Sequence, residues 1–185
     1  MWETSETEPA NSLSQMKTPD DADWDVLQRR IGTDELYAPT TVLLAVSALI
    51  PNVEDIRASL TNADLSGPTV WTSFLVTDNS LVKVSMSFEP DFFDQNAEKA
   101  HGSNPPRGEV LEAWVRPLAT ATCLSVDSVG RRQGHKRSWF PLGVVNVRFT
   151  DGVEVPLPSQ SRLREGNDRD ESDEFLHALR VASGF

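Results

Sequence analysis

Two apolar runs flank one tight polar turn between residues 70 and 89, and this is the clearest pattern in the chain. The run at 70–77 is rich in aromatic and β-branched residues, which favour strands, and the run at 81–88 alternates apolar with polar positions. Asp78 and Asn79 between the runs tolerate turn geometry. The pattern predicts a β-hairpin.

A second hairpin is predicted at residues 142–150 and 153–157, because the Asp151-Gly152 pair between them is a strong turn signal. Two further strands are predicted near residues 110–118 and 120–129, and the proline close to the end of the first one fits a bend or a sheet edge. The middle of the chain is therefore predicted to be rich in β-structure.

Amphipathic helices are predicted on both sides of this β-rich part. The first, residues 18–32, starts on a Thr-Pro pair and ends at Gly32, and the second, residues 171–182, is expected to be capped by Ser172. The side chains expected to face the body are Trp24, Leu27 and Ile31 in the first helix and Phe175, Leu176, Leu179 and Val181 in the second.

The apolar run at residues 42–50 has no period that separates a helix from a buried strand. Its leucine and alanine content favours a helix, Pro51 ends it, and Asn52 can cap a further turn. On this basis we predict helical structure over residues 41–63.

Composition further predicts a disordered tail, a long polar loop and the cellular location of the protein. The chain of 185 residues suits one domain with appendages, with a disordered acidic tail at residues 1–17 and a long polar loop at residues 89–109. No secretion signal is recognisable, the longest apolar run is about half of what a bilayer-spanning helix needs, and Cys123 is the sole cysteine. These features predict a cytoplasmic protein with no transmembrane segment.

The formal net charge of −11 and the isoelectric point near 4.6 argue against a nucleic-acid or anionic-membrane binder, unless a local basic patch overrides the overall charge. One loop has that character. Its basic and aromatic residues are Arg131, Arg132, His135, Lys136, Arg137 and Trp139. A solvated hairpin loop explains them, and the functional alternative is capture of an acidic segment, a phosphate or a nucleic acid.

No residue is predicted to be catalytic, cofactor-binding or metal-ligating. His101, His135 and His177 lack metal-ligand spacing, and no nucleotide-binding or hydrolase motif is present. Cys123 lies in the middle of a predicted strand, where a structural role is favoured over a nucleophile. The clustered carboxylates lead into helices, where capping and solubility explain them.

The order of these elements resembles the bacterial pleckstrin-homology-like (PH-like) domains. The matching segments are residues 34–38 as the opening strand, 74–84 as a Leu-Thr-Asp hairpin and 147–152 as the last hairpin. The resemblance covers residues 33–185 and implies an α+β fold, a partly open antiparallel β-barrel of about seven strands plugged by the C-terminal helix. Against that pattern, residues 39–68 are a helical insertion between the first two strands, and residues 89–109 are another insertion.

Three functions are compatible with these observations. The first is a non-enzymatic protein-interaction module, in which the helical segment 41–63 packs against a partner protein or a second copy of the chain. The second is binding of an anionic ligand, a lipid headgroup, a phosphate or a nucleic acid, by the loop at 131–137. The first insertion has Arg57 as its sole basic residue, so no phosphoinositide pocket carries over from the family. The third is an enzyme whose site is scattered over the fold and includes Arg116.

Overall fold

The computed structural model describes residues 21–33, 36–89, 108–133, 139–160 and 167–185. The helices are α1 (Asp21–Ile31), α2 (Thr40–Leu49) and α4 (Asn167–Ser183), with 3₁₀ turns η1 (Val53–Asp55) and η2 (Leu118–Thr120). The strands are β1 (Ala58–Asp64), β2 (Thr69–Val76), β3 (Ser80–Phe88), β4 (Gly108–Pro117), β5 (Ala121–Val126), β6 (Val145–Phe149) and β7 (Glu154–Leu157). Among these helices, none is both long and apolar enough to cross a bilayer.

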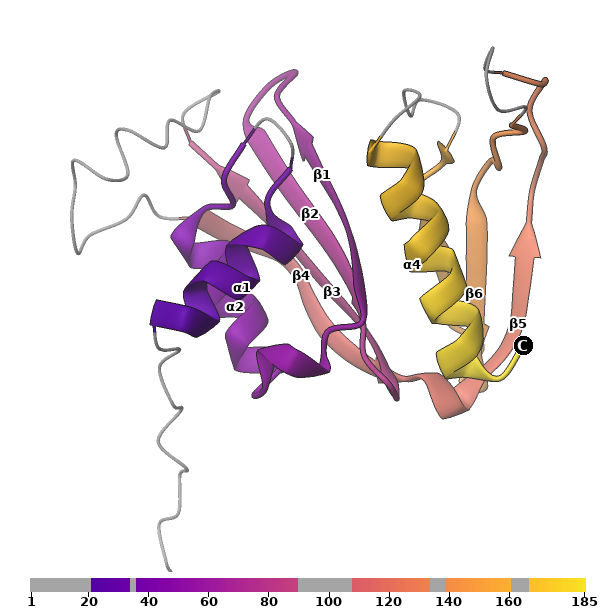
Figure 1. The fold of residues 1–185 in the computed structure, drawn as a ribbon, viewed down its shortest axis with the longest axis horizontal. Helices are drawn as coiled ribbons and strands as arrows, with labels where there is room; N and C mark the ends of the chain where they lie inside the picture. Colours follow the sequence, from indigo (N-terminus) through magenta and orange to yellow (C-terminus); the bar gives the residue numbers. More distant parts are fainter. Residues whose placement is uncertain (1–20, 34–35, 90–107, 134–138, 161–166) are drawn as a thin grey trace, which may run out of the picture.

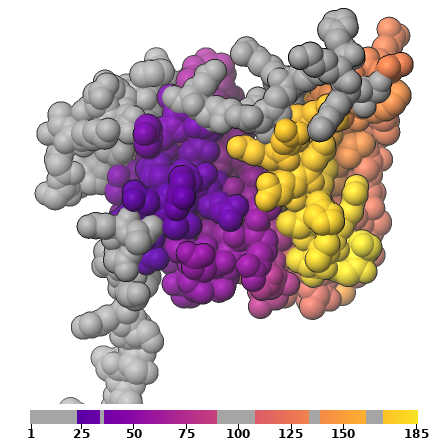
Figure 2. Space-filling model, viewed as in Figure 1, coloured from indigo at the N-terminus to yellow at the C-terminus, as the bar shows by residue number. Residues whose placement is uncertain are grey.

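The strands form two antiparallel sheets. One has four strands in the order β1-β2-β3-β4, and the other has three in the order β5-β6-β7. Figure 1 shows α1 and α2 on one face of the four-stranded sheet, here called the outer face, and α4 between its inner face and the three-stranded sheet. Both helical layers contribute to the surface seen in Figure 2. The α+β class with a C-terminal helix is confirmed, but the two sheets do not close into a barrel in the described ranges.

Both predicted hairpins are present. In the first, β2 pairs with β3, and the Thr77 N–H donates to the Ser80 carbonyl at 2.9 Å to close the turn. In the second, β6 pairs with β7, and Gly152 has a φ of 82°, which a residue with a Cβ rarely adopts. The turn residues predicted both hairpins because the preference of Asp, Asn and Gly for turn conformations is a local property.

The prediction of helical structure over 41–63 is correct only for its first half. Helix α2 covers most of the apolar run, whereas the last residues form strand β1. Ala58 and Leu60 are buried and Ser59 between them is more exposed, a strand-like alternation, and β1 pairs along its length with β2. Val53, Ile56 and Leu60 are spaced as on a helix, but a 3₁₀ turn and an extended segment bury all three as well.

The predicted opening strand at 34–38 is not found. Residues 36–38 belong to no strand, and residues 34 and 35 lie outside the described ranges. Because β1 is the first strand of the described chain, α1 and α2 precede the sheet, and the helical segment is not an insertion between the first two strands. The tail at 1–17 and nearly all of the loop at 89–109 also lie outside the described ranges.

The core has two parts, one on each face of the four-stranded sheet. The outer part joins α1 and α2 to residues such as Trp71, Val82 and Phe88. The inner part joins the sheet to the three-stranded sheet and to α4. Alternate residues of β2 and β3 supply the two parts, as the two-residue repeat of a strand requires. A sheet buried on both faces explains why β2 and β3 contain so many apolar residues.

Helix α4 packs as predicted at Phe175, Leu176 and Leu179, all of which are buried in the inner part of the core. Val181 does not face the body, because 68% of it is exposed. Ser172 is not the cap, since the helix begins five residues earlier at Asn167. Ser172 is instead buried and accepts a hydrogen bond of 2.9 Å from Gln160 Nε2.

Candidate functional site

The basic loop extends the hairpin between β5 and β6. Backbone hydrogen bonds link Gly130 to Pro141 at 2.7 Å and Gln133 to Trp139 in both directions, at 2.7 and 3.1 Å. Arg131 lies on this extension and is exposed. Arg132 follows it and is exposed too, whereas His135, Lys136 and Arg137 lie outside the described ranges.

Trp139 has a structural role at the base of this loop. Its side chain is buried, and the Arg169 guanidinium carbon lies 4.8 Å from the centre of its ring. Arg169 belongs to the first turns of α4, so this cation–π contact ties the loop to the C-terminal helix. In this position the indole ring is covered by the protein itself, and the accessible part of the predicted anion site in the described chain consists of Arg131 and Arg132.

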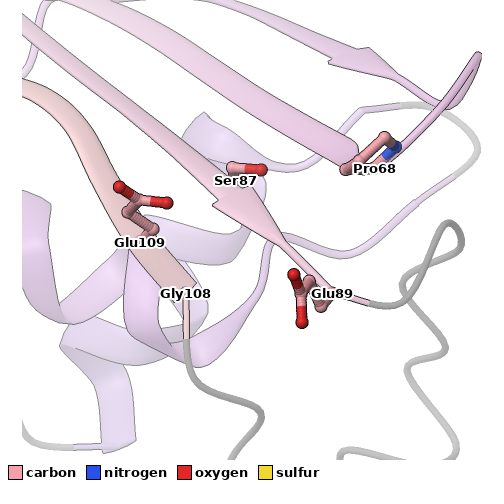
Figure 3. A pocket seen from close by; sticks show the side chains of 5 residues that line it. All are labelled: Pro68, Ser87, Glu89, Gly108 and Glu109. Carbon is pink, nitrogen blue, oxygen red and sulfur yellow. The ribbon is translucent and has the colours of Figure 1, made fainter.

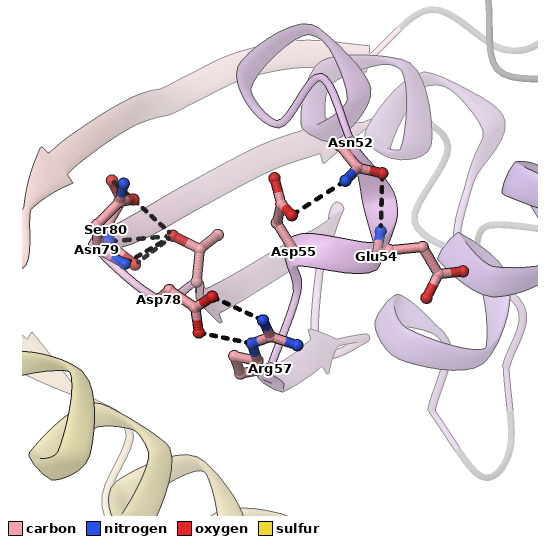
Figure 4. Close-up of polar contacts among 8 residues, drawn as sticks. Asn52, Glu54, Asp55, Arg57, Asp78, Asn79 and Ser80 are labelled. Carbon is pink, nitrogen blue, oxygen red and sulfur yellow. Dashed lines mark hydrogen bonds and ion pairs between the residues drawn. The ribbon is translucent and has the colours of Figure 1, made fainter.

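An ion pair lies at the end of the four-stranded sheet where β2 turns into β3 (Figure 4). Arg57, just before β1, donates from Nε and Nη2 to the two carboxylate oxygens of Asp78, both at 2.6 Å. Asp78 lies in the β2–β3 turn, and this double hydrogen bond lowers the pKa of its carboxyl and raises that of the guanidinium. Both side chains are exposed, so the pair fastens a surface turn and forms no pocket.

A second polar cluster lies on the inner face, where β4 meets the other sheet. Lys83 donates to Glu112 at 2.7 Å, and the Trp114 indole N–H donates to the same carboxylate at 3.1 Å. Arg116 donates to Asp151 at 2.8 Å and lies 5.1 Å from the ring centre of Phe149. The contacts of Arg116 connect the four-stranded sheet to the β6–β7 hairpin, and those of Glu112 join β3 to β4.

The same hydrogen bonds lower the pKa values of two carboxyl groups, which bears on whether they could act as a general acid or base. The hydrogen bond from Lys83, and then that from Trp114, lowers the pKa of Glu112, and the hydrogen bond from Arg116 lowers the pKa of Asp151. A general acid or base for work near neutral pH needs a carboxyl with a raised pKa. Glu112 and Asp151 are held ionised by cations instead, which fits a structural cluster, and Arg116 is engaged in it.

An open pocket of about 300 Å³ lies at the far end of the inner face, among Pro68, Ser87, Glu89, Gly108 and Glu109 (Figure 3). Both glutamates are exposed to solvent. Exposed carboxylates are common on an acidic protein, and the described residues contain no group of three or more His, Cys, Asp or Glu side chains that could hold a metal ion. The half-buried Cys123 on β5 and the exposed His177 on α4 belong to other elements than this pocket.

The segment predicted to offer a partner surface, residues 41–63, is largely part of the core. Helix α2 packs on β3 and β4, and its residues Val42, Leu43 and Val46 are buried. The apolar side chains of α2 therefore cover the outer face of the sheet. Leu44, at 40% exposure, is the large apolar side chain of α2 that remains open to solvent.

The largest run of exposed apolar residues on a strand lies on β4. Val110, Leu111 and Val115 are 53%, 50% and 41% exposed. Strand β4 is at the end of the four-stranded sheet, and within the described ranges no strand pairs with its outer side. An exposed edge with apolar side chains is a template for pairing with another chain.

The backbone of β4 adds hydrogen-bonding groups to this edge. The Leu118 N–H donates to the Asn79 carbonyl at 2.7 Å, which fixes the phase of the β3–β4 ladder. Residues of an antiparallel ladder alternately direct their N–H and C=O groups toward and away from the neighbouring strand. Counting back from Leu118, the backbone groups of Ala113 and Val115 point away from β3. The edge thus offers two donors and two acceptors at regular spacing.

Sequence reasoning placed β4 correctly as a strand but missed it as a surface. The residues of β4 show no clean alternation of apolar and polar types, which is typical of a strand that is exposed on both sides at an edge. The nearby Pro117 was the one available signal, because proline in a sheet is confined to edges and bends.

Comparison with known proteins gives no relative for this chain. No protein-family model matches it, and no curated protein and no solved structure matches it either.

Proposed function

We propose that this chain is a non-enzymatic protein-interaction module of PH-like fold, and that the edge of β4 is its binding surface. Support for the fold comes from seven antiparallel strands in two sheets, followed in the chain by a C-terminal helix packed between the sheets, with β1 at Ala58–Asp64 in place of the opening strand expected at 34–38. The lone cysteine supports a cytoplasmic setting.

The single observation that carries the function is the open edge of β4, with its exposed valines and leucine and its outward backbone groups. Proteins that add a strand from a partner obtain affinity from backbone hydrogen bonds and specificity from alternate side chains. Both ingredients are present here, at Ala113 and Val115. The polar clusters described above have their charges paired within the chain, so they support a structural role better than the scattered enzyme site.

Photo-crosslinking in cells tests this surface. A benzophenone amino acid in place of Val115 should capture a defined protein, because the side chain lies on the edge that would be covered. The same substitution at Val181, which is more exposed but lies on α4, is the matched control and should not yield that product.

Ala113→Pro provides the second comparison. Proline removes an N–H that points away from β3, so the ladder within the sheet remains while the edge loses a donor. Capture from position 115 should fall in this background. Equal capture from positions 115 and 181, or capture that Ala113→Pro leaves unchanged, would refute the proposed surface.

A further inference from the structure

The part of β4 that can accept another strand is short and well defined. Leu111 is the extra residue of a β-bulge, since Met86 pairs with Val110 and Ser85 pairs with Glu112. At the other end, Pro117 has no N–H to donate. Among the described residues, the regular edge that no strand pairs with therefore runs from Glu112 to Arg116.

We propose that this edge binds a second copy of the chain, with the two β4 strands antiparallel and a two-fold axis at Trp114. This inference rests on the proposed function and names its partner. In that register Ala113 lies opposite the second copy's Val115, and the two residues exchange N–H···O=C bonds. The two-fold axis repeats the exchange, which gives four backbone hydrogen bonds.

The neighbouring registers use the edge less well. An axis at Ala113 would place Val115 opposite the bulge at Leu111. An axis at Val115 would place Ala113 opposite Pro117, which cannot donate. Of the three axes, the one at Trp114 places both Ala113 and Val115 opposite a residue that lies outside the bulge and has both an N–H donor and a C=O acceptor.

Side chains favour the same register. On the inner face, Glu112 of each copy lies opposite the other copy's Arg116, so two pairs of opposite charge form, and the two Trp114 rings meet at the axis. On the outer face, Ala113 and Val115 of both copies form a small apolar cluster. The strand is complementary to itself in charge and in apolar character, and this is the argument for a second copy over an unrelated partner.

The charges needed for this pairing have solvent access, and each also has a partner within its own copy, Lys83 for Glu112 and Asp151 for Arg116. The Glu112 side chain is 49% exposed and that of Arg116 is 26% exposed. Arg116 gives one N–H to Asp151, and a guanidinium has five. The net charge of −11 on each copy opposes association, and a pairing of five residues is small, so we expect a weak dimer that forms with rising concentration.

A charge-reversal exchange with the full-length chain tests both the dimer and its register. Glu112→Arg alone places arginine opposite Arg116 twice, and Arg116→Glu alone places glutamate opposite Glu112 twice, so each variant should lose affinity by about tenfold or more. An equimolar mixture restores both opposite-charge pairs and should form a heterodimer near the wild-type affinity. Sedimentation equilibrium with one copy fluorescently labelled measures all three. Glu109→Arg, an exposed charge of β4 outside the segment, is the matched control and should leave the dimer intact.

Disulfide trapping checks the register directly. In a Cys123→Ser background, Trp114→Cys should oxidise to a covalent dimer, because residues at the axis have Cα atoms within disulfide range. Ala113→Cys should not, since its counterpart in the second copy lies two positions away. Circular dichroism of each variant confirms that it folds.

The outcomes separate the dimer from the proposed function. A chain that stays monomeric, a mixture that does not restore association, or trapping through Ala113→Cys instead of Trp114→Cys would each overturn the dimer. If position 115 still captures a different protein in cells, the interaction surface stands and its partner is not a second copy. If position 115 captures nothing, the proposed surface fails together with the dimer.

Discussion

Arg57 and Asp78 show how two exposed side chains can set the geometry of a turn. The residues are 21 positions apart, yet both carboxylate oxygens of Asp78 accept from the guanidinium. The same region receives a backbone hydrogen bond, in which the Arg57 N–H donates to the Val76 carbonyl at 2.8 Å. The start of β1 is thereby fastened to the end of β2 by backbone and side chain together.

The lowered pKa of Asp78 predicts a pH-dependent contribution to stability. A carboxyl whose pKa is lower in the folded state stabilises the fold above its unfolded pKa of about 4, and this contribution is lost as the pH falls through the folded pKa. Asp78→Asn should therefore lower the melting temperature at pH 7, and the difference from wild type should shrink below about pH 4. Thermal melts followed by circular dichroism across this range measure the effect.

A double-mutant cycle with Arg57→Gln assigns that effect to the pair. If the pair is the cause, adding Arg57→Gln to Asp78→Asn costs little beyond either single change. Strictly additive losses, or a difference that persists unchanged at low pH, would show that the contribution of Asp78 does not come from this ion pair.

Single residues also show what the sequence could not reveal. Trp139 stands next to a basic run, and its sequence neighbours made it a candidate for ligand binding. Its actual neighbour is Arg169, thirty positions along the chain, so its burial depends on tertiary packing. Val181 is apolar, but at 3.6 residues per turn it lies on the side of α4 opposite Phe175 and Leu179. The next residue, Ala182, packs against the core while Val181 stays exposed.

At the scale of elements, the pairing of β3 with β4 depends on the absence of a side chain at Gly108. A Cβ at this position would lie 2.6 Å from the Phe88 ring and 2.9 Å from the Met86 methyl group, and both side chains are buried in the outer part of the core. Gly108→Ala should thus destabilise the fold by about 1–3 kcal/mol, the usual cost of overpacking. Urea unfolding measures this difference.

Gly67→Ala is the matched control for that change. Gly67 precedes the neighbouring strand β2, and a Cβ there would meet nothing within 4 Å. Its substitution should be close to neutral. Equal losses from the two alanines would mean that glycine's backbone freedom, and not the contact with Phe88, explains the requirement at Gly108.

The helices, hairpins and strands differ in how far their local sequence determines their structure. Hairpin turns and amphipathic helices were predicted well, because the residues that form them also carry the signal. Strand β1 was not, since its alternation is short and its identity depends on pairing with β2. The edge character of β4 depends on the order of strands in the sheet, for which Pro117 was the one local signal.

At the scale of the whole molecule, α4 is the element that makes one core from two sheets. Its residues Phe175, Leu176 and Leu179 are buried together with side chains from both sheets. Gln160 adds a polar link, because its amide accepts from the Leu142 N–H at 3.1 Å and donates to Ser172 at 2.9 Å. The sequence predicted an amphipathic C-terminal helix packed on the body, whereas the two sheets that it joins became clear only from the strand pairing.

The net charge of the molecule opposes the anion-binding alternative. A field from eleven excess negative charges repels phosphates and nucleic acids, so any anion site at Arg131 and Arg132 has to work against it. Salt ions would screen the two arginine charges, so the site would attract an anion only at short range. Its affinity should consequently depend steeply on salt and on these two side chains.

This alternative makes a sharp prediction for a polyphosphate probe. If the basic loop is an anion site, Arg131→Gln combined with Arg132→Gln should weaken binding, and binding to wild type should disappear at about 0.5 M salt, where the Debye length is only a few ångströms. Arg180→Gln removes one exposed positive charge from α4 and serves as the control for net charge alone. Fluorescence anisotropy measures all three proteins. Binding that survives high salt, or that Arg180→Gln reduces as much as the paired change does, would exclude the loop as the site.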